Sequence, residues 1–145
     1  MSAKNTDSKI SLPLGDWPIE QLPGLTQDEQ SQLQNYGIKT TGGLFRQGKT
    51  PEARLILANK LQVNLQCVNK WVALSDLARI PGVGTEHCGL LLHAGIASVA
   101  QLAQTPIHRL HRQILRLQVA TMQRRDLCPA VEEVQQWCQK AQALK

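Results

Sequence analysis

Aromatic side chains are scarce in this chain of 145 residues: phenylalanine, tyrosine and tryptophan together make up 3% of it. Proteins that bind single-stranded nucleic acid without sequence preference stack successive bases on aromatic side chains. The low aromatic content therefore argues against a base-stacking surface. The hydrophobic content of 42% is ordinary for a globular chain, and the length is sufficient to bury a core in one domain or two small ones.

Long apolar runs are absent as well. No stretch approaches the roughly 20 residues that a membrane-spanning helix needs. The N-terminal residues also lack the apolar segment of a secretory signal peptide. We therefore expect a cytoplasmic protein that does not enter a membrane.

Cysteine and histidine spacing gives no metal-binding pattern. The four cysteines lie far apart with no C-x-x-C pair, so we interpret them as reduced core residues rather than a disulfide framework. A zinc site built from His87, Cys88 and His93 with a distant cysteine matches no common ligand spacing. We therefore expect no metal and no cofactor. The cysteines are Cys67, Cys88, Cys128 and Cys138.

Catalytic signatures are missing too. The sequence has no Walker loop, no H-E-x-x-H motif and no nucleophile elbow. Cys88 directly follows His87, and adjacent residues of a helix point about 100° apart, so they do not form a catalytic pair. Lys60 and Lys70 are conceivable Schiff-base lysines, but nothing near them in the sequence indicates activation. We expect no enzymatic activity and no catalytic residues.

A tight turn is predicted at residues 80–84, with the sequence Ile-Pro-Gly-Val-Gly. An apolar-periodic stretch precedes it, with Ser75 as a candidate N-cap, and a second helical stretch runs on to Gly95, a typical residue just past a helix C-terminus. Gly82 and Gly84 permit positive φ and a close approach to the backbone amides. Because these amides lie at a helix N-terminus, they favour an anion such as a phosphate.

This turn, together with Leu91 and the Gly95-Ile96 pair, resembles the helix-hairpin-helix motif of DNA-binding and repair proteins. The resemblance implies a hairpin that grips the phosphate backbone without reading sequence. Over roughly residues 15 to 140 the chain also resembles a family common in cyanobacteria, known as a domain of unknown function and built on this motif. That wider resemblance implies a fold and no particular activity. Hairpins of this type also serve as protein contacts.

The motif occurs twice in the sequence. Shifted by 58 positions, residues 22–25 align with residues 80–83, and a constant register over 23 positions indicates an internal duplication. We predict an all-α fold in a single compact domain, with a flexible arm at 1–14 and helix-hairpin-helix repeats at 15–73 and 74–145 joined by connecting helices. The further aligned pairs are Leu33 with Leu91, Gly37 with Gly95, Ile38 with Ile96 and Leu44 with Leu102.

The two copies differ at a decisive position of the turn. Thr26 stands where the second copy has Gly84, and with Glu29 it forms the S/T-x-x-E pattern of a capping box. A capping box satisfies the amides of the helix's own first turn, and Asp28 beside it would repel a phosphate. We therefore predict that the first copy is structural and that only the second binds phosphate.

Capping signals and apolar spacing predict the remaining helices. The ranges are 40–47, 51–61, a helix that follows Asn64, 98–104, 106–124 and a last helix from Pro129. Trp71 and Trp137 are predicted to be core residues. The predicted apolar stripe of the helix at 51–61 consists of Leu55, Ile56, Ala58 and Leu61.

Charge is distributed unevenly along the chain, whose formal net charge is +5. Residues 87–125 contain no aspartate or glutamate but five arginines and all four histidines. On a helix, Arg109, Arg112 and Arg116 fall within about 60° of one another. Non-specific duplex binding needs such a basic surface, because phosphate neutralisation supplies most of its affinity. The alternative is an ordinary solvated face, or arginines paired with the two glutamates at 132–133.

We therefore expect sequence-independent binding to nucleic acid, to DNA more than to RNA, through the second hairpin and a nearby basic face. The other interpretation is a protein-interaction or assembly scaffold without nucleic-acid contact, which the lost glycine of the first copy and the modest net charge favour. The residues predicted to bind the backbone are Gly82, Val83, Gly84 and Thr85 through their amides, and Arg79, Arg109, Arg112 and Arg116 through their side chains.

Overall fold

Helices make up nearly all of the regular structure in the computed structural model, which describes residues 15–122 and 129–144 and, for residues 119–122, the backbone alone. Within these ranges there is no strand, only an isolated bridge between Pro18 and Thr40. The predicted all-α fold is therefore confirmed. The helices are η1 (Ile19–Gln21), α2 (Gln27–Asn35), α3 (Thr41–Gln47), α4 (Pro51–Leu61), α5 (Leu65–Ala78), α6 (Gly84–His93), α7 (Val99–Gln104), α8 (Ile107–Met122) and α9 (Val131–Leu144). The predicted N-terminal arm, Arg124, Arg125 and Cys128 lie outside the described residues.

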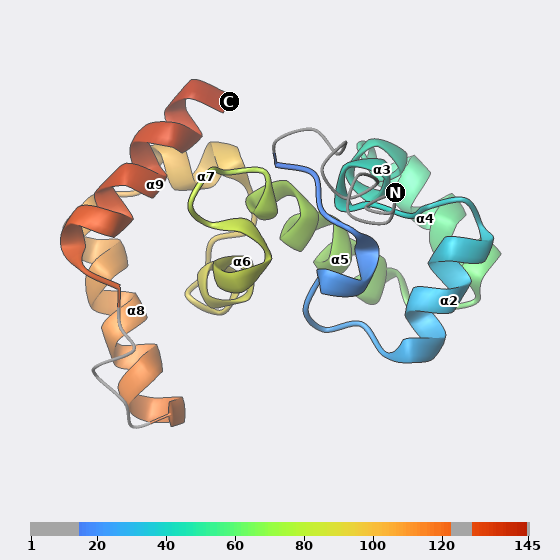
Figure 1. Ribbon diagram of the computed structural model, residues 1–145, viewed down its shortest axis with the longest axis horizontal. Helices are drawn as coiled ribbons and strands as arrows, with labels where there is room; N and C mark the ends of the chain where they lie inside the picture. The colour runs from blue at the N-terminus through green and yellow to red at the C-terminus, as the bar shows by residue number, and fades with distance from the viewer. Residues whose placement is uncertain (1–14, 123–128, 145) are drawn as a thin grey trace, which may run out of the picture.

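The helix α5 lies at the middle of the molecule. Figure 1 shows α2, α3 and α4 at one end and α8 and α9 as a pair at the other. α5 packs against α3, α4 and α6, while α7 and α8 pack against α9. A single hydrophobic cluster joins these helices into one domain. Trp71 and Trp137, which are 2% and 1% exposed, belong to that core as predicted.

Side-chain caps begin several helices at the predicted places. Thr50, Asn64 and Ser98 each accept a hydrogen bond from an amide in the first turn of α4, α5 and α7, respectively. Pro51 follows Thr50 in the first turn of α4, where its missing N–H leaves no hydrogen bond unmade. These caps satisfy donors that a helix cannot pair internally, which is why local sequence predicted the helix starts well.

The predicted cap at Ser75 was wrong. α5 runs without interruption through this position, and the buried Ser75 hydroxyl donates to the carbonyl of Trp71 one turn earlier. A serine inside a helix can satisfy its hydroxyl in this way, so its capping preference does not end the helix. The apolar residues before and after Ser75 therefore belong to one helix instead of two.

The buried side of α4 also differs from the predicted stripe. Leu57 is buried together with Ala58 and Leu61, whereas Leu55 and Ile56 are 49% and 55% exposed. Four of the five residues 54–58 are apolar, so spacing alone does not select one side of this helix. Its packing against α3 and α5 makes that selection.

The backbone repeats the 58-residue register of the sequence. Gly24 of the first turn (residues 22–26) has φ +86°, and Gly82 of the second turn (residues 80–84) has φ +91°. At the ends of the helices that follow, Gly37 and Gly95 have φ +97° and +98°. The two pairs of equivalent glycines therefore adopt the same left-handed conformations.

Hydrogen bonds that end α2 and α6 repeat as well. The amide of Ile38 donates to the carbonyl of Leu33 at 2.8 Å, and the amide of Ile96 donates to the carbonyl of Leu91 at 2.9 Å. All four residues are buried. A bond of this span after a left-handed glycine is the Schellman pattern of helix termination. The aligned leucine, glycine and isoleucine residues are thus explained by one C-cap used twice.

The predicted boundary between residues 73 and 74 falls within α5. This helix closes the first half of the chain by packing against α3 and α4, and it also leads into the second turn and packs against α6. Seven of its residues are buried. The two halves therefore share a helix.

Candidate nucleic-acid interface

The second turn presents only part of its backbone to solvent. Gly82 is exposed, whereas Val83 is 1% exposed and Gly84 is also buried. Thr85 is half-buried and Glu86 is exposed in the first turn of α6. The accessible atoms of this segment therefore lie at Gly82 and at the start of α6.

Two of the four predicted backbone donors are already used within the turn. The amides of Val83 and Gly84 both donate to the carbonyl of Ile80, at 3.0 and 3.4 Å. The amides of Gly82, Thr85 and Glu86 donate to no acceptor in the part of the chain that the structure describes. Val83 has no capping side chain, which leaves the N-terminus of α6 open to an external acceptor.

Trp17 explains the second glycine of the turn. Gly84 has φ +53°, and a Cβ atom added to it would lie 3.0 Å from Cζ2 of Trp17. The indole Nε1 of Trp17 donates to the carbonyl of Ala78 at 3.0 Å, which fixes the ring against the end of α5. Gly84 is therefore required by close packing and by its backbone conformation, without reference to a ligand.

Trp137 of α9 lies beside the other glycine. A Cβ atom added to Gly82 would lie 3.5 Å from both Cδ1 and Nε1 of the Trp137 indole. The ring of His87 packs on the same indole, with the two ring centroids 5.1 Å apart. The second turn thus lies between two tryptophans that come from distant parts of the chain.

The first turn satisfies two of its amides through the predicted capping box. The amide of Glu29 donates to the Thr26 hydroxyl at 3.1 Å, and the amide of Thr26 donates to the Glu29 carboxylate at 2.9 Å. This is the complete capping box. Lys70 and Leu74 of α5 lie beside Gly24, where the second turn has an indole.

Arg79 is occupied by contacts within the protein. Its Nε and Nη2 donate to Oδ1 of Asp76 at 2.9 and 2.7 Å, and its guanidinium lies over the Phe45 ring. The other carboxylate oxygen of Asp76 accepts from the Val99 amide at the start of α7. Arg79 therefore helps to join α5 to its neighbours and has little freedom to bind a phosphate.

The three arginines predicted on α8 form an exposed row. Arg109, Arg112 and Arg116 are all exposed, whereas Leu110 and Ile114 are fully buried. At 100° per residue, the row lies roughly 150° around α8 from the buried pair, so it faces away from the core. We call these three residues the arginine row.

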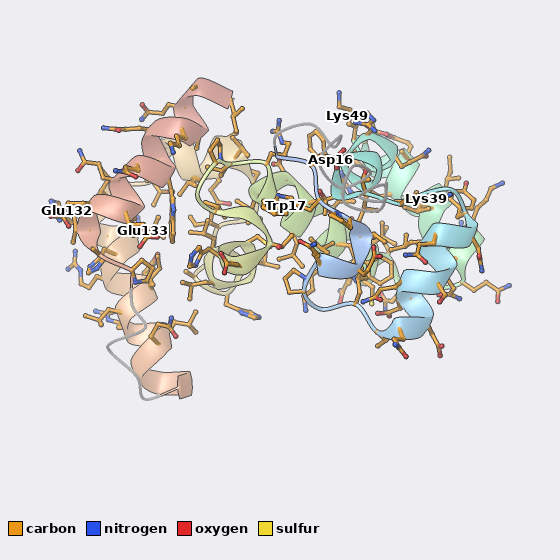
Figure 2. The ribbon with its side chains drawn as sticks, viewed as in Figure 1. Asp16, Trp17, Lys39, Lys49, Glu132 and Glu133 are labelled. Carbon is orange, nitrogen blue, oxygen red and sulfur yellow. The ribbon has the colours of Figure 1, made fainter. Side chains whose placement is uncertain are left out.

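The arginine row has no acidic partner within the described residues. Glu132 and Glu133 lie near the start of α9, which packs beside α8 (Figure 2), yet no ion pair joins either of them to the row. The ion pair that the described residues do contain is Arg79 with Asp76. Of the two alternatives to a nucleic-acid surface, pairing with these glutamates is therefore not observed.

The structure brings the arginine row and the second turn onto neighbouring elements without contact between them. α8 packs against α6 and α9 through its buried side, and the second turn packs against α9 through Trp137. The arginine row lies on the opposite side of α8, away from the core. A polyanion would therefore meet two separate contact points.

Comparison of the sequence with known protein families finds a match. The model of a family described as a domain of unknown function (DUF4332) matches residues 23–144. The chain belongs to this family. No curated protein and no solved structure matches it. The DUF4332 match includes residues 23–26 of the first turn, the whole second turn, α8 and Trp137, while Trp17 precedes it.

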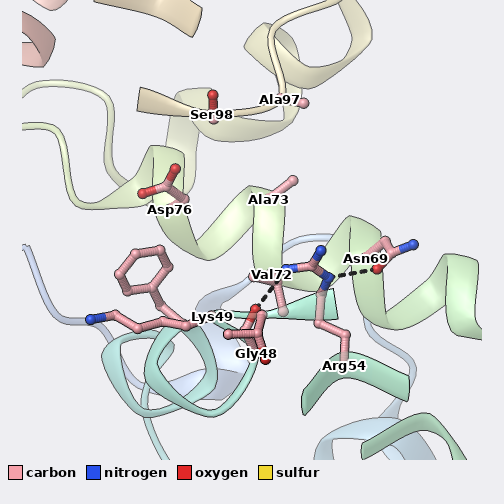
Figure 3. Close-up of a pocket in the computed structure, with 11 residues that line it drawn as sticks. Gly48, Lys49, Arg54, Asn69, Val72, Ala73, Asp76, Ala97 and Ser98 are labelled. Atoms are coloured by element: carbon pink, nitrogen blue, oxygen red, sulfur yellow. Dashed lines mark hydrogen bonds between the residues drawn. The ribbon is translucent and has the colours of Figure 1, made fainter. Parts of the chain in front are cut away.

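A groove of about 670 Å³ is a feature of this DUF4332 chain that sequence reasoning did not predict. Figure 3 shows it between the start of α4, the side of α5 and the segment before α7. Arg54 crosses one wall, donating to the Gly48 carbonyl and to Asn69 at 2.9 Å each. Much of its lining is apolar, including Val72 and Ala73. No local motif marks the groove, because its walls come from separate helices.

Among the described residues of the DUF4332 chain, Cys67, Cys88 and Cys138 form no disulfide, and Cys88 and Cys138 are buried. Burial raises the pKa of the Cys88 thiol to about 11 and also raises the pKa of Cys138. Both thiols therefore stay protonated at neutral pH and are poor nucleophiles. Among the described residues no three histidine, cysteine or acidic side chains converge as metal ligands, and no helix is both long and apolar enough to cross a membrane.

Proposed function

We propose that this protein binds nucleic acid through the sugar-phosphate backbone, without reading sequence and without catalysis, and that duplex DNA is its preferred form. The observation that carries the proposal is the arginine row: three exposed guanidinium groups without acidic partners among the described residues, on a helix within an acid-free stretch. Unpaired arginines on one face are suited to charge-assisted bonds to phosphate.

The length of the row matches a few phosphates. From Arg109 to Arg116 the helix rises about 10.5 Å, and one DNA strand carries a charge about every 3.4 Å along its axis. Three neutralised phosphates give a slope of about −3 for the logarithm of the binding constant against the logarithm of salt concentration. We expect a dissociation constant on the order of 10⁻⁴ to 10⁻⁶ M, as for other non-specific contacts.

The second turn supplies the proposed additional contact, of the helix-hairpin-helix type. The unpaired amides of Gly82 and Thr85 can donate to a phosphate oxygen, helped by the N-terminus of α6. Val83 and Gly84 are left out of this contact because their amides bind Ile80. Arg79 is left out because Asp76 holds it.

The test is fluorescence anisotropy with a random-sequence duplex at several salt concentrations. One variant replaces the arginine row by glutamine: Arg109→Gln, Arg112→Gln and Arg116→Gln. The matched control removes the same net charge from exposed side chains at the other end of the molecule: Lys39→Gln, Arg46→Gln and Lys60→Gln.

We expect the row variant to lose most of the affinity and to flatten the salt slope by about 0.9 per arginine, while the control keeps the wild-type slope. Equal losses in the two variants would mean that only net charge matters. Absence of binding by the wild type at low salt would overturn the proposal.

A protein-interaction role is the second candidate, and one observation favours it. Leu55 and Ile56 on α4 are 49% and 55% exposed, which leaves an apolar surface without a partner in this chain. If the wild type does not bind the duplex, Leu55→Ser with Ile56→Ser tests this role. A concentration-dependent increase in mass that the variant abolishes would support self-association.

A further inference from the structure

Trp137 is a buried side chain with an unused hydrogen-bond donor. The residue is 1% exposed, and its indole Nε1–H has no acceptor among the residues that the structure describes. Trp17, by contrast, donates its Nε1–H to Ala78. No fully enclosed side-chain nitrogen or oxygen in the described residues lacks a partner, so the small exposed part of Trp137 includes its nitrogen. Buried tryptophans usually find a partner for this group.

The unused donor lies at the second turn. The edge of the indole that carries Cδ1 and Nε1 faces Gly82, 3.5 Å from where a Cβ atom would stand. Gly82 is exposed, and its own amide is unpaired, as is that of Thr85 at the start of α6. Three N–H groups without internal acceptors therefore belong to the second turn, the start of α6 and the indole edge that lies against this turn.

We propose that the Nε1–H of Trp137 and the amides of Gly82 and Thr85 form one binding site for a phosphate group. The inference rests on the second contact of the proposed function and extends it by assigning a side-chain donor from α9. A tetrahedral oxyanion has enough acceptor oxygens for three donors, and a helix N-terminus favours its charge. The phosphate can be a phosphodiester of a nucleic acid or a free inorganic ion.

The charged neighbours of the site limit its affinity. Glu86 is exposed at the third position of α6 and repels an anion, and among the described residues no lysine or arginine lies over the Trp137 ring. His87 packs against the indole ring and helps to hold its orientation. The site therefore binds a single phosphate weakly, and the arginine row supplies most of the affinity for a polymer.

The indole signals in a proton–nitrogen NMR spectrum provide a direct test. The wild-type protein is titrated with inorganic phosphate at constant ionic strength and pH, with chloride as the balancing anion. We expect the Trp137 Nε1–H signal and the Gly82 and Thr85 amide signals to shift along one saturation curve. The indole signals of Trp17 and Trp71 are internal controls that should stay in place. Trp71→Phe and Trp137→Phe assign the three signals.

Trp137→Phe removes the N–H while keeping an aromatic ring against Gly82 and His87. A hydrogen bond to a charged group is worth about 1.5–3 kcal/mol, so we expect phosphate to bind at least about tenfold more weakly to the two amides. Trp71→Phe should leave this affinity unchanged. If the amides shift but the Trp137 indole does not, or if nothing shifts, the inference is overturned. The wild-type titration decides this even if the variant fails to fold.

Duplex binding separates this inference from the proposed function. If phosphate shifts none of the three signals and Trp137→Phe binds DNA as the wild type does, while the arginine-row variant does not bind, the inference fails and the proposed function stands. If phosphate shifts the three signals but the wild type does not bind DNA, the site is real and its ligand is free phosphate. The two arms thus distinguish the two sources of the phosphate.

Discussion

The first and second turns share a left-handed glycine but differ in how the helix that follows begins. Both have a left-handed glycine at the same register, Gly24 and Gly82. In the first turn Thr26 and Glu29 close a capping box around the start of α2. In the second turn the equivalent amides, those of Gly84 and His87, donate to the backbone carbonyls of Ile80 and Val83, and no side chain caps α6.

The surroundings of the two turns differ as well. Lys70 and Leu74 lie beside Gly24, whereas Trp137 lies beside Gly82 and Trp17 beside Gly84. The glycine that distinguishes the second turn is therefore needed for an indole to pack against it. The comparison teaches that one sequence difference has two consequences, an indole packed against the glycine and a helix that begins without a side-chain cap, which mutations can separate.

The largest loss of stability is expected when Gly84 of the second turn is replaced by threonine, the residue at the equivalent position of the first turn. Gly84→Thr forces a β-branched residue to φ +53° and against the Trp17 ring, which we expect to lower the free energy of unfolding by about 3 kcal/mol. Gly95→Thr also meets positive φ but open space, so its expected loss is about 1–2 kcal/mol. Urea denaturation of both variants measures the difference. Equal losses would show that Trp17 adds nothing to the requirement for glycine.

The next-largest effect on stability is expected from the buried Cys88 thiol of α6 at high pH. Cys88 occupies the position of the half-buried Gln30 in α2, and burial raises its pKa from 9.0 to about 11. Between these two values the unfolded state loses the proton while the folded state keeps it, so the wild type loses up to about 2 kcal/mol of stability as pH rises. Below pH 9 this contribution is intact. Cys88→Ala should remove that part of the pH dependence, as denaturation at pH 8 to 11 can test.

Removing the capping box should have a smaller effect. Thr26→Ala leaves the Glu29 amide without its hydroxyl acceptor and is expected to cost about 1 kcal/mol in unfolding free energy. Thr85→Ala at the start of α6 removes a side chain without a hydrogen bond and should change stability by less than about 0.5 kcal/mol. Thermal denaturation compares the two. A similar loss in both would contradict the contrast between the turns.

The smallest effect concerns phosphate binding itself. Glu86→Gln removes a negative charge beside the unpaired amides and should tighten duplex binding about twofold at low salt. Asp28→Asn makes the same change in net charge at the equivalent exposed position of α2, beside a turn that has no indole at its glycine, and should leave binding unchanged. Anisotropy titrations at one salt concentration compare them. Equal tightening would assign the effect to net charge.

Local sequence patterns predicted the fold well because they encode local interactions. Thr50, Asn64 and Ser98 cap helices as predicted, since a cap depends on residues within one turn. The 58-residue register likewise predicted the shared geometry of Gly37 and Gly95, because a Schellman C-cap involves only neighbouring residues.

The candidate site was less predictable because long-range packing determines it. Trp17 and Trp137 lie more than 50 positions from the glycines that they lie beside, so no local pattern connects them. Arg79 was predicted to bind phosphate, but Asp76 holds it in an ion pair. Periodicity did predict one face for the arginine row, since that depends only on the geometry of α8.

The shared helix α5 has a consequence for how the chain folds. Its seven buried residues face neighbours from both halves, so neither half has a complete core without it. Loss of either half would expose part of α5 to water, which couples the two halves energetically. We therefore expect the two halves to unfold as one cooperative unit, and neither half to be stable when it is produced alone.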